Sequence, residues 1–222
     1  APSMSAQTFS ISENAAAGTT VGTMVATNPD QGQTITFSIQ SGNTSSAFAI
    51  NSTTGAITVN NTTALNFESS PVFTLVIQAL DNGTPALSAS ANAVININDV
   101  NEMPSMSGQT FTINENAANG STVGTMTATN PDQGQSIAYS IQSGNSGSAF
   151  AINTVTGVIT VNNTAALNFE AISQFTLGIQ ALDNGTPALS ASANAVINLS
   201  NVNEAPSMSA QTFSISENAA AG

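Results

Sequence analysis

The sequence predicts an all-β chain of tandem seven-stranded Greek-key β-sandwiches placed end to end. Apolar residues make up 41% of the chain and recur with period two, which is the spacing of a strand with one buried face. Turn residues separate these apolar runs at short intervals, as in a β-sandwich. No stretch has the helical period, and the abundant Ser, Thr, Asn, Gly and Ala would indicate disorder only without this alternation.

The chain repeats itself with an offset of 102 residues and no insertion or deletion. Residues 1–102 and 103–204 differ at 24 aligned positions, whereas residues 205–222 are identical to residues 1–18. We therefore predict one repeat over residues 1–102, a second over 103–204, and the first strand and start of a third over 205–222. The identity of the third copy to the first indicates a 204-residue super-repeat, and we expect the chain to be a segment of a longer array.

The first copy should contain seven strands, each with an apolar and a polar face. They are expected at residues 7–12, 21–27, 34–40, 47–51, 56–60, 72–80 and 88–98. Residues 52–55 predict a hairpin, in which Gly55 supplies a positive φ. The second copy supports the assignment of faces: Val25 on an outward face becomes Thr127, while Phe37 on an inward face becomes only Tyr139.

The composition excludes several classes of function. Twelve acidic residues and no Lys, Arg or His give a net charge of −12, so nucleic acid and anionic membranes are poor partners. No apolar run reaches the roughly 18 residues of a membrane span, and we expect no membrane insertion in this segment. General acid–base catalysis would depend on Tyr139 alone, which we expect in the core or at its rim, and paired carboxylates lack an aromatic sugar platform. We predict that the chain is not an enzyme.

The acidic residues are placed too regularly for a purely solubilising role. Every acid of the first copy returns at the 102-residue offset except Asp99, which becomes Asn201. Solvated surface charges would be expected to vary between copies. The junction at residues 99–104 gathers carboxylates in a chain with no basic side chain, so an external cation is needed to neutralise it.

Five motifs recur in the same order in both copies and, together with Ser216-Glu217-Asn218 of the third, contain all twelve acids. In the first copy they are Ser12-Glu13-Asn14, Ala26-Thr27-Asn28-Pro29-Asp30, Leu65-Asn66-Phe67-Glu68, Ala79-Leu80-Asp81-Asn82-Gly83-Thr84-Pro85 and Asp99-Val100-Asn101-Glu102-Met103-Pro104. Each copy thereby resembles a cadherin repeat, and the short Asp-Val-Asn-Glu-x-Pro linker resembles that of bacterial cadherin-like arrays. The resemblance implies an immunoglobulin-like sandwich, with Ca²⁺ bound at the seams between repeats.

Transferred residue by residue, the resemblance implies a ligand set for each seam. For the first seam these residues are Glu13, Glu68, Asp99, Asn101, Glu102, Asn130, Asp132 and Asp183, with Met103 offering only its backbone carbonyl. For the second seam they are Glu115, Glu170, Asn201, Asn203 and Glu204, while Asp30 and Asp81 would serve a seam before residue 1. Six carboxylates could balance up to three Ca²⁺ at the first seam, and we expect two or three ions there.

Some positions depart from the family pattern. Asn28, Asn66, Asn130 and Asn168 stand where the family usually has Asp, which keeps an oxygen ligand but removes a charge and should lower the affinity for calcium. Asn201 makes the second seam weaker by one charge than the first. These departures leave calcium as the expected cofactor with the ion count open.

Two functions of different classes fit the sequence. The first is a calcium-stiffened spacer or adhesion module of a large bacterial surface protein, extracellular, with neighbouring repeats, identical chains or a cell-surface or matrix ligand as partners. The alternative is the body of an extracellular filament, in which a last strand at residues 211–216 completes a neighbouring sandwich. Homophilic adhesion is a weaker third reading, because the chain has no Trp to exchange between molecules.

Overall fold

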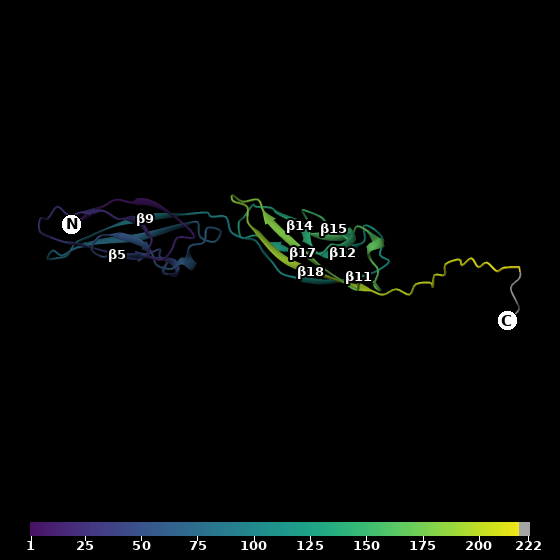
Figure 1. Ribbon diagram of the computed structural model, residues 1–222. Coiled ribbons are helices and arrows are strands. Elements are labelled where there is room, and N and C mark those ends of the chain that lie inside the picture. Colours follow the sequence, from purple (N-terminus) through teal and green to yellow (C-terminus); the bar gives the residue numbers. More distant parts are fainter. Residues whose placement is uncertain (218–222) are drawn as a thin grey trace. The chain divides into compact units, whose positions relative to one another are not determined.

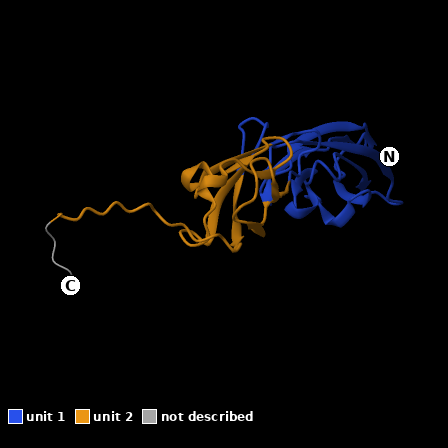
Figure 2. Ribbon diagram, turned by 90° about the vertical axis from the view of Figure 1, so that its right-hand side faces the viewer, with its two compact units in different colours: residues 1–105, 129–137, 182–190 blue, residues 106–128, 138–181, 191–222 orange. Residues whose placement is uncertain are grey.

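The computed structural model describes residues 1–217 and confirms the predicted all-β class (Figure 1). Within these residues the only helical elements are the short 3-10 turns η1 (Thr44–Ser46), η2 (Thr62–Ala64), η3 (Ser146–Ser148) and η4 (Thr164–Ala166). The chain divides into two compact units, coloured separately in Figure 2. The first comprises residues 1–105, 129–137 and 182–190, and the second comprises residues 106–128, 138–181 and 191–222. Two loops of the second copy therefore belong to the first unit.

The strands of the first copy form three sheets. They are β1 (Ser3–Met4), β2 (Gln7–Ser12), β3 (Thr20–Thr23), β4 (Ala26–Thr27), β5 (Ile35–Ser41), β6 (Phe48–Ile50), β7 (Ala56–Val59), β8 (Val72–Asp81) and β9 (Ser88–Asn98). The sheet orders are β2-β9-β8-β5, β3-β7-β6 and β1-β4. Strand β2 runs parallel to β9, with Phe9 opposite Ile95, whereas β8 and β9 are antiparallel. The parallel pair sets the end of β2 beside the end of β9, where the acidic junction begins.

One predicted strand is wrong in detail, because residues 21–27 form two strands instead of one. Strand β3 pairs with β7, and β4 pairs with β1, so the chain changes partner between them. Met24 lies at this change: its side chain is buried and its backbone N–H donates to the Gly55 carbonyl at 2.9 Å. Strand β1 was not predicted, since two residues are too few to display an alternating pattern.

The core of the first copy follows the predicted inward faces. Phe73, Leu75, Ile77 and Ile95 are buried, each contributing roughly 1.5–3 kcal/mol relative to an exposed side chain. The rings of Phe48 and Phe73 meet edge to face with centroids 5.2 Å apart. The outward assignment is also confirmed, as the Val25 side chain is 61% exposed.

The predicted hairpin at residues 52–55 is present between β6 and β7. Gly55 has φ +73° and its N–H donates to the Asn51 carbonyl at 2.9 Å. The Asn51 side chain accepts hydrogen bonds from the backbone N–H groups of Thr53 and Thr54. A positive φ here explains the glycine, because a Cβ would be strained in this conformation.

The second copy repeats this topology. Its strands are β10 (Ser105–Met106), β11 (Gln109–Asn114), β12 (Thr122–Thr125), β13 (Ala128–Thr129), β14 (Ile137–Ser143), β15 (Phe150–Ile152), β16 (Val158–Val161), β17 (Gln174–Asp183) and β18 (Ser190–Ser200). The sheet orders are β11-β18-β17-β14, β12-β16-β15 and β10-β13. Tyr139 is buried, as predicted, and its hydroxyl accepts a hydrogen bond from the Ala128 N–H at 2.9 Å.

The strand predicted at residues 211–216 is not formed in this structure. Residues 201–217 have no strand, and Met208, Phe213 and Ile215 are 96%, 88% and 84% exposed. The equivalent strands β2 and β11 each pair with the last strand of their own copy, and residues 205–222 contain no equivalent of β9 or β18. The rest of the third copy, residues 218–222, lies outside the described residues.

Candidate metal centre

Glu13 directly follows β2 and anchors the acidic junction of the first unit. Its carboxylate accepts two backbone hydrogen bonds, from Phe67 N–H at 2.8 Å on Oε2 and from Val100 N–H at 2.7 Å on Oε1. The side chain is only 6% exposed. These bonds tie the end of β2 to the loop before Glu68 and to the linker after β9, and they hold a carboxylate at the base of the site.

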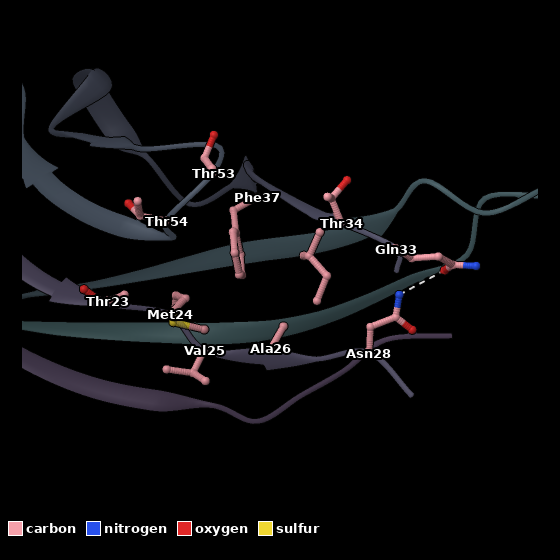
Figure 3. Close-up of a pocket in the computed structure, with 11 residues that line it drawn as sticks. Thr23, Met24, Val25, Ala26, Asn28, Gln33, Thr34, Phe37, Thr53 and Thr54 are labelled. Carbon is pink, nitrogen blue, oxygen red and sulfur yellow. Dashed lines mark hydrogen bonds between the residues drawn. The ribbon is translucent and has the colours of Figure 1, made fainter. Parts of the chain in front are cut away.

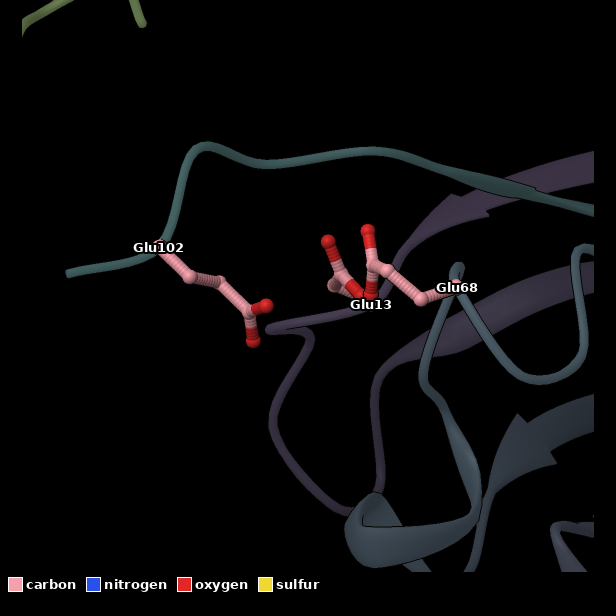
Figure 4. A group of neighbouring side chains, drawn as sticks. All are labelled: Glu13, Glu68 and Glu102. Carbon is pink, nitrogen blue, oxygen red and sulfur yellow. The ribbon is translucent and has the colours of Figure 1, made fainter. Parts of the chain in front are cut away.

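Four more acids surround Glu13 within the first unit. Glu13, Glu68 and Glu102 form one group, and Glu68, Asp99 and Asp132 form a second; in each group one carboxylate oxygen per residue lies within 4.8 Å of the others. Figure 4 shows the carboxylates of Glu13 and Glu68 side by side, with that of Glu102 pointing toward them. We call these five residues the acidic centre. Glu68 belongs to both groups and connects them.

Three buried oxygens of the acidic centre have no hydrogen-bond partner among the described residues: Glu68 Oε2, Glu102 Oε2 and Asp132 Oδ1. Asp132 is only 4% exposed, and its other oxygen, Oδ2, accepts from Glu102 N–H at 2.9 Å. An unpaired buried oxygen normally costs one to several kcal/mol. With no Lys, Arg or His in the chain, no side-chain cation can compensate this charge.

The pKa shifts of the acidic centre also indicate a lack of compensating positive charge. Burial is the main cause that raises the pKa of Glu68 and of Glu102, and the charges of neighbouring carboxylates raise both further. Asp99 is exposed as a residue, yet partial desolvation of its carboxyl, followed by the charge of Asp132, raises its pKa as well. Each carboxyl group is harder to ionise because the others are close by. A bound cation would offset the repulsion between the ionised carboxylates.

The donor set fits a hard cation. A cavity of about 200 Å³ at the acidic centre is lined by Phe67, Glu68, Pro71, Asp99 and Gln133. All candidate donors are oxygen atoms, which Ca²⁺ and Mg²⁺ prefer, and Ca²⁺ accepts the larger and less regular set of six to eight ligands. The residues therefore suit Ca²⁺ by charge, by donor type and by room for a cation with water.

The remaining predicted ligands of the first seam lie beside the acidic centre. Asn101 donates from Nδ2 to Asp183 Oδ2 at 3.3 Å, and Asn130 accepts the Asp132 N–H at 3.2 Å on Oδ1. Met103 is 60% exposed. Sequence reasoning missed Gln135, which bonds to both asparagines. Its recurrence as Gln33 and Gln135 in otherwise polar loops is the one signal that could have indicated it.

The predicted second-seam residues of the second unit do not form such a cluster among the described residues. Glu115 is 2% exposed and accepts the N–H groups of Phe169 and Val202. Glu170 accepts from Asn201 Nδ2 at 3.0 Å. Asn203 and Glu204 are exposed in the segment without strands.

The two acids predicted to serve a seam before residue 1, Asp30 and Asp81, differ in burial and in their contacts. Asp30 is about half exposed, with Oδ2 3.9 Å from the N-terminal amine of Ala1. Asp81 is buried, and its Oδ1 accepts the N–H groups of Gly83 and Leu87. Neither belongs to a group of three carboxylates within residues 1–217.

An open groove elsewhere in the first unit offers no metal chemistry. Met24, Val25 and Phe37 line it, together with polar residues such as Thr54 and the hydrogen-bonded pair Asn28 and Gln33 (Figure 3). No lining residue is charged. The groove therefore lacks the groups that acid–base catalysis or cation binding would need.

Fold and site together define an array of β-sandwich modules with carboxylates gathered where one copy follows another. Residues 7–98 and 109–200 each match the Cadherin domain family model. Because these matches cover well over half of the chain, the chain belongs to the cadherin domain family. Cadherin domains are structural modules of adhesion proteins, which confirms the prediction that this chain is not an enzyme.

Similar sequences come from animal cell-surface proteins. The chain is 38% identical over 213 residues to human Protocadherin Fat 1, which covers 92% of this chain and 5% of the relative. It is 36% identical over 221 residues to the Fat-like cadherin-related tumor suppressor homolog of Drosophila melanogaster, covering 96% of this chain and 5% of the relative. The chain thus spans about a twentieth of these proteins. Animal relatives lend no support to the predicted bacterial source.

Solved cadherin structures share the fold. Mouse Cadherin-23 EC22-24 has a TM-score of 0.70 at 26% identity, covering 90% of this chain and 64% of that one. Human CDH23 EC21-23 has a TM-score of 0.72 at 22% identity, covering 88% and 72%, and this likeness concerns the fold alone. Within residues 1–217, no helix is long and apolar enough to cross a membrane.

Proposed function

We propose that the acidic centre binds Ca²⁺ and that the bound ions fasten successive repeats of an extracellular adhesive rod. One observation carries the proposal: three buried carboxylate oxygens, supplied by both copies, have no hydrogen-bond partner among residues 1–217, and the chain has no basic side chain. Membership of the cadherin domain family supports it. Calcium would supply the positive charge that the chain itself lacks.

Glu13, Glu68, Asp99, Glu102 and Asp132 are the proposed ligands. Glu68 would be shared between ions, since it belongs to both groups of carboxylates. The Glu102 N–H bond to Asp132 brings the linker to a loop of the second copy, and Glu13 bonds to the linker at Val100. Ions bound by these residues would therefore join segments from both copies, and metal binding would become structural stability.

The other predicted ligands form weaker proposals. Glu115, Glu170, Asn201, Asn203 and Glu204 would contribute to a second seam only together with acids of a following repeat. Asp30 and Asp81 would do the same for a preceding repeat. We also propose repeats at residues 1–102 and 103–204, with residues 205–222 opening a third.

A calcium titration with a matched pair of variants tests the proposal. Asp132→Asn removes one charge and one unpartnered oxygen from the acidic centre. Asp30→Asn makes the same chemical change at the equivalent position of the first copy, outside the acidic centre. Isothermal titration should give a calcium affinity at least tenfold lower for Asp132→Asn and an unchanged affinity for Asp30→Asn. Equal affinities in the two variants, or no binding by the wild-type chain, would refute the proposal.

Small-angle X-ray scattering separates a spacer from a filament body. A calcium-stiffened spacer should scatter as a monomer at all micromolar concentrations and become more flexible when a chelator removes calcium. The filament alternative, which the relatives do not support, requires particles that grow with protein concentration. We also propose partners beyond the neighbouring repeats, such as identical chains or a matrix ligand. The proposed location is the cell surface.

A further inference from the structure

A second polar group lies next to the acidic centre in the first unit, built from amides. Gln135 donates from Nε2 to Asn101 Oδ1 at 2.7 Å and accepts from Asn130 Nδ2 at 3.1 Å on Oε1. Asn101 in turn donates from Nδ2 to the Pro187 carbonyl at 2.8 Å and to Asp183 Oδ2 at 3.3 Å. We call Asn101, Asn130 and Gln135 the amide latch. It links the linker to both second-copy loops of the first unit.

Every side-chain oxygen of this group already has a donor. Asp183 Oδ1 accepts the N–H groups of Gly185 at 3.1 Å and Leu189 at 2.8 Å, and Oδ2 accepts from Asn101. Asn130 Oδ1 accepts the Asp132 N–H at 3.2 Å. Asp183 is 3% exposed. The acidic centre differs, since three of its buried oxygens have no hydrogen-bond donor within the described part of the chain.

A carboxylate oxygen has two lone pairs, so a single backbone N–H, as on each oxygen of Glu13, leaves one lone pair for a cation. A side-chain N–H directed into the site, as from Asn101 or Gln135, instead occupies the position that a cation would take. An N–H group directed at a carboxylate oxygen carries partial positive charge, so a cation placed there would lose that bond and face the N–H dipole. A cation between Asn101 and Asp183 would have to displace Asn101 Nδ2 and Gln135 Nε2 together. The unpartnered oxygens of Glu68, Glu102 and Asp132 impose no such loss.

We infer that the amide latch takes the place of a third cation, so that the first seam holds two Ca²⁺ and is fastened to Asp183 by hydrogen bonds alone. This inference rests on the proposed function, because it assumes that the acidic centre binds calcium. The five carboxylates of the acidic centre nearly balance two divalent ions. Asp183, the sixth acid predicted for this seam, is satisfied without metal.

The first copy shows that half of the latch is built into the repeat. Asn28 donates from Nδ2 to Gln33 Oε1 at 3.0 Å, which is the same bond as that between Asn130 and Gln135 (Figure 3). In the second copy, Asn101 of the linker adds a hydrogen bond to Gln135 and completes the amide latch.

Gly185 has no side chain, and this leaves room for the Asn101 side chain. A Cβ added at Gly185 would overlap the Asn101 side chain, with its Oδ1, Cγ and Nδ2 as the nearest atoms. At the equivalent Gly83, the nearest atom to such a Cβ would be Gln33 Nε2 at 2.9 Å. Close approach of the linker amide therefore requires glycine at 185, and this fits a site closed by hydrogen bonding.

Ion counting by native mass spectrometry on the intact chain tests the inference. The wild type should bind two Ca²⁺ with high affinity. The double variant Asn101→Asp/Gln135→Ala opens the latch and adds a carboxylate, and it should gain one ion. The equivalent change in the first copy, Asn28→Asp/Gln33→Ala, is the control and should leave the count at two. Three tightly bound ions in the wild type would overturn the inference, whereas none would overturn the proposed function instead.

A second measurement tests the latch without metal. In chelator, Gln135→Ala should make the backbone amides of residues 182–190 exchange with deuterium roughly fivefold faster, which corresponds to one net hydrogen bond of about 1 kcal/mol. Gln33→Ala should leave that segment unchanged. Equal exchange of residues 182–190 in wild type and Gln135→Ala would show that the latch does not hold the loop, and the inference would fail.

Discussion

The surroundings of Glu13 and Glu115 have the same backbone hydrogen bonds but different neighbouring charges. Glu13 accepts the N–H groups of Phe67 and Val100, and Glu115 accepts those of Phe169 and Val202, all within 2.7–2.8 Å. Around Glu13, however, the pKa values of Glu68 and Glu102 are raised. The two backbone hydrogen bonds instead lower the pKa of Glu115.

Two changes account for this difference. Asp99 beside Glu68 becomes Asn201, whose amide donates to Glu170 at 3.0 Å and replaces repulsion by a hydrogen bond. The first unit also contains Asp132 from the second copy, and no equivalent acid joins Glu115 among the described residues. The repeat sequence thus determines the backbone hydrogen bonds around Glu13 and Glu115. The excess negative charge that requires a cation depends instead on Asp99 and on the second-copy loop that carries Asp132.

Calcium removal should have the largest effect and should act on the first centre alone. A ligand at a hundredfold excess over its Kd stabilises by about 2.7 kcal/mol per site, which corresponds to a melting temperature shift of roughly 10 °C or more for a domain of this size. Calorimetry with calcium and then with chelator measures the shift. An identical melting curve under both conditions would mean that the acidic centre is not a calcium site.

Exchanging the residues at 99 and 201 should transfer the electrostatic difference between the two centres. Asn201→Asp removes the hydrogen bond to the exposed Glu170 and adds a like charge, so metal-free stability should fall by about 0.5–1 kcal/mol. Asp99→Asn should raise metal-free stability and weaken calcium binding. Urea denaturation in chelator measures both changes. The comparison fails if the two substitutions shift stability in the same direction.

The pH dependence should also differ in sign between the two centres in calcium-free buffer. Raised pKa values at Glu68 and Glu102 mean that the folded state binds protons more tightly than the unfolded state. Their contribution to stability is present below the unfolded pKa of about 4.3 and is lost as pH rises through the folded pKa. The lowered pKa of Glu115 acts oppositely, contributing above that unfolded value and losing its contribution as pH falls through its folded pKa.

Carboxyl ¹³C shifts followed through a pH titration give each midpoint directly. Glu68 and Glu102 should titrate at higher pH than Glu115, and their contribution to the metal-free melting temperature should grow as the pH is lowered through their raised pKa values. Midpoints in the reverse order would contradict the electrostatic account.

A comparably small effect is expected away from the acidic residues, at the pair Phe37 and Tyr139. Tyr139→Phe removes the hydroxyl that accepts the Ala128 N–H at 2.9 Å, and it should cost about 1 kcal/mol in the free energy of unfolding. Phe37→Tyr is the reciprocal change in the first copy and should not reduce stability if the same bond can form with the Ala26 N–H. Urea denaturation of both variants measures this. An unchanged stability in Tyr139→Phe would show that the bond is worth nothing net.

Much of the fold could be predicted from alternation and repetition. The inward faces of β8 and β9, the hairpin at Gly55 and the burial of Tyr139 all follow from apolar period, turn chemistry and the comparison of copies. Strand β1 could not, because two residues carry no period, and the sequence did not indicate the change of partner that divides residues 21–27 into β3 and β4. Residues 211–216 were expected as a strand, yet a strand needs a partner that sequence alternation alone cannot supply.

The acids of the candidate site could be predicted from the sequence, but the hydrogen bonding of their carboxylate oxygens could not. Glu13 and Glu68 were identified by motif, and the structure brings them together with Glu102. Which oxygens remain unpartnered depends on hydrogen-bond geometry, as the contrast between Asp132 and Asp183 shows. Gln135 carries no charge and belongs to no motif, so only its contacts indicate its role.

Crystallography of the chain grown with calcium tests the central claim most directly. The account predicts ions bonded at about 2.3–2.6 Å to Glu68 Oε2, Glu102 Oε2 and Asp132 Oδ1, with Asn101 still hydrogen-bonded to Gln135. Well-ordered crystals in millimolar calcium without ions at these three oxygens would contradict it.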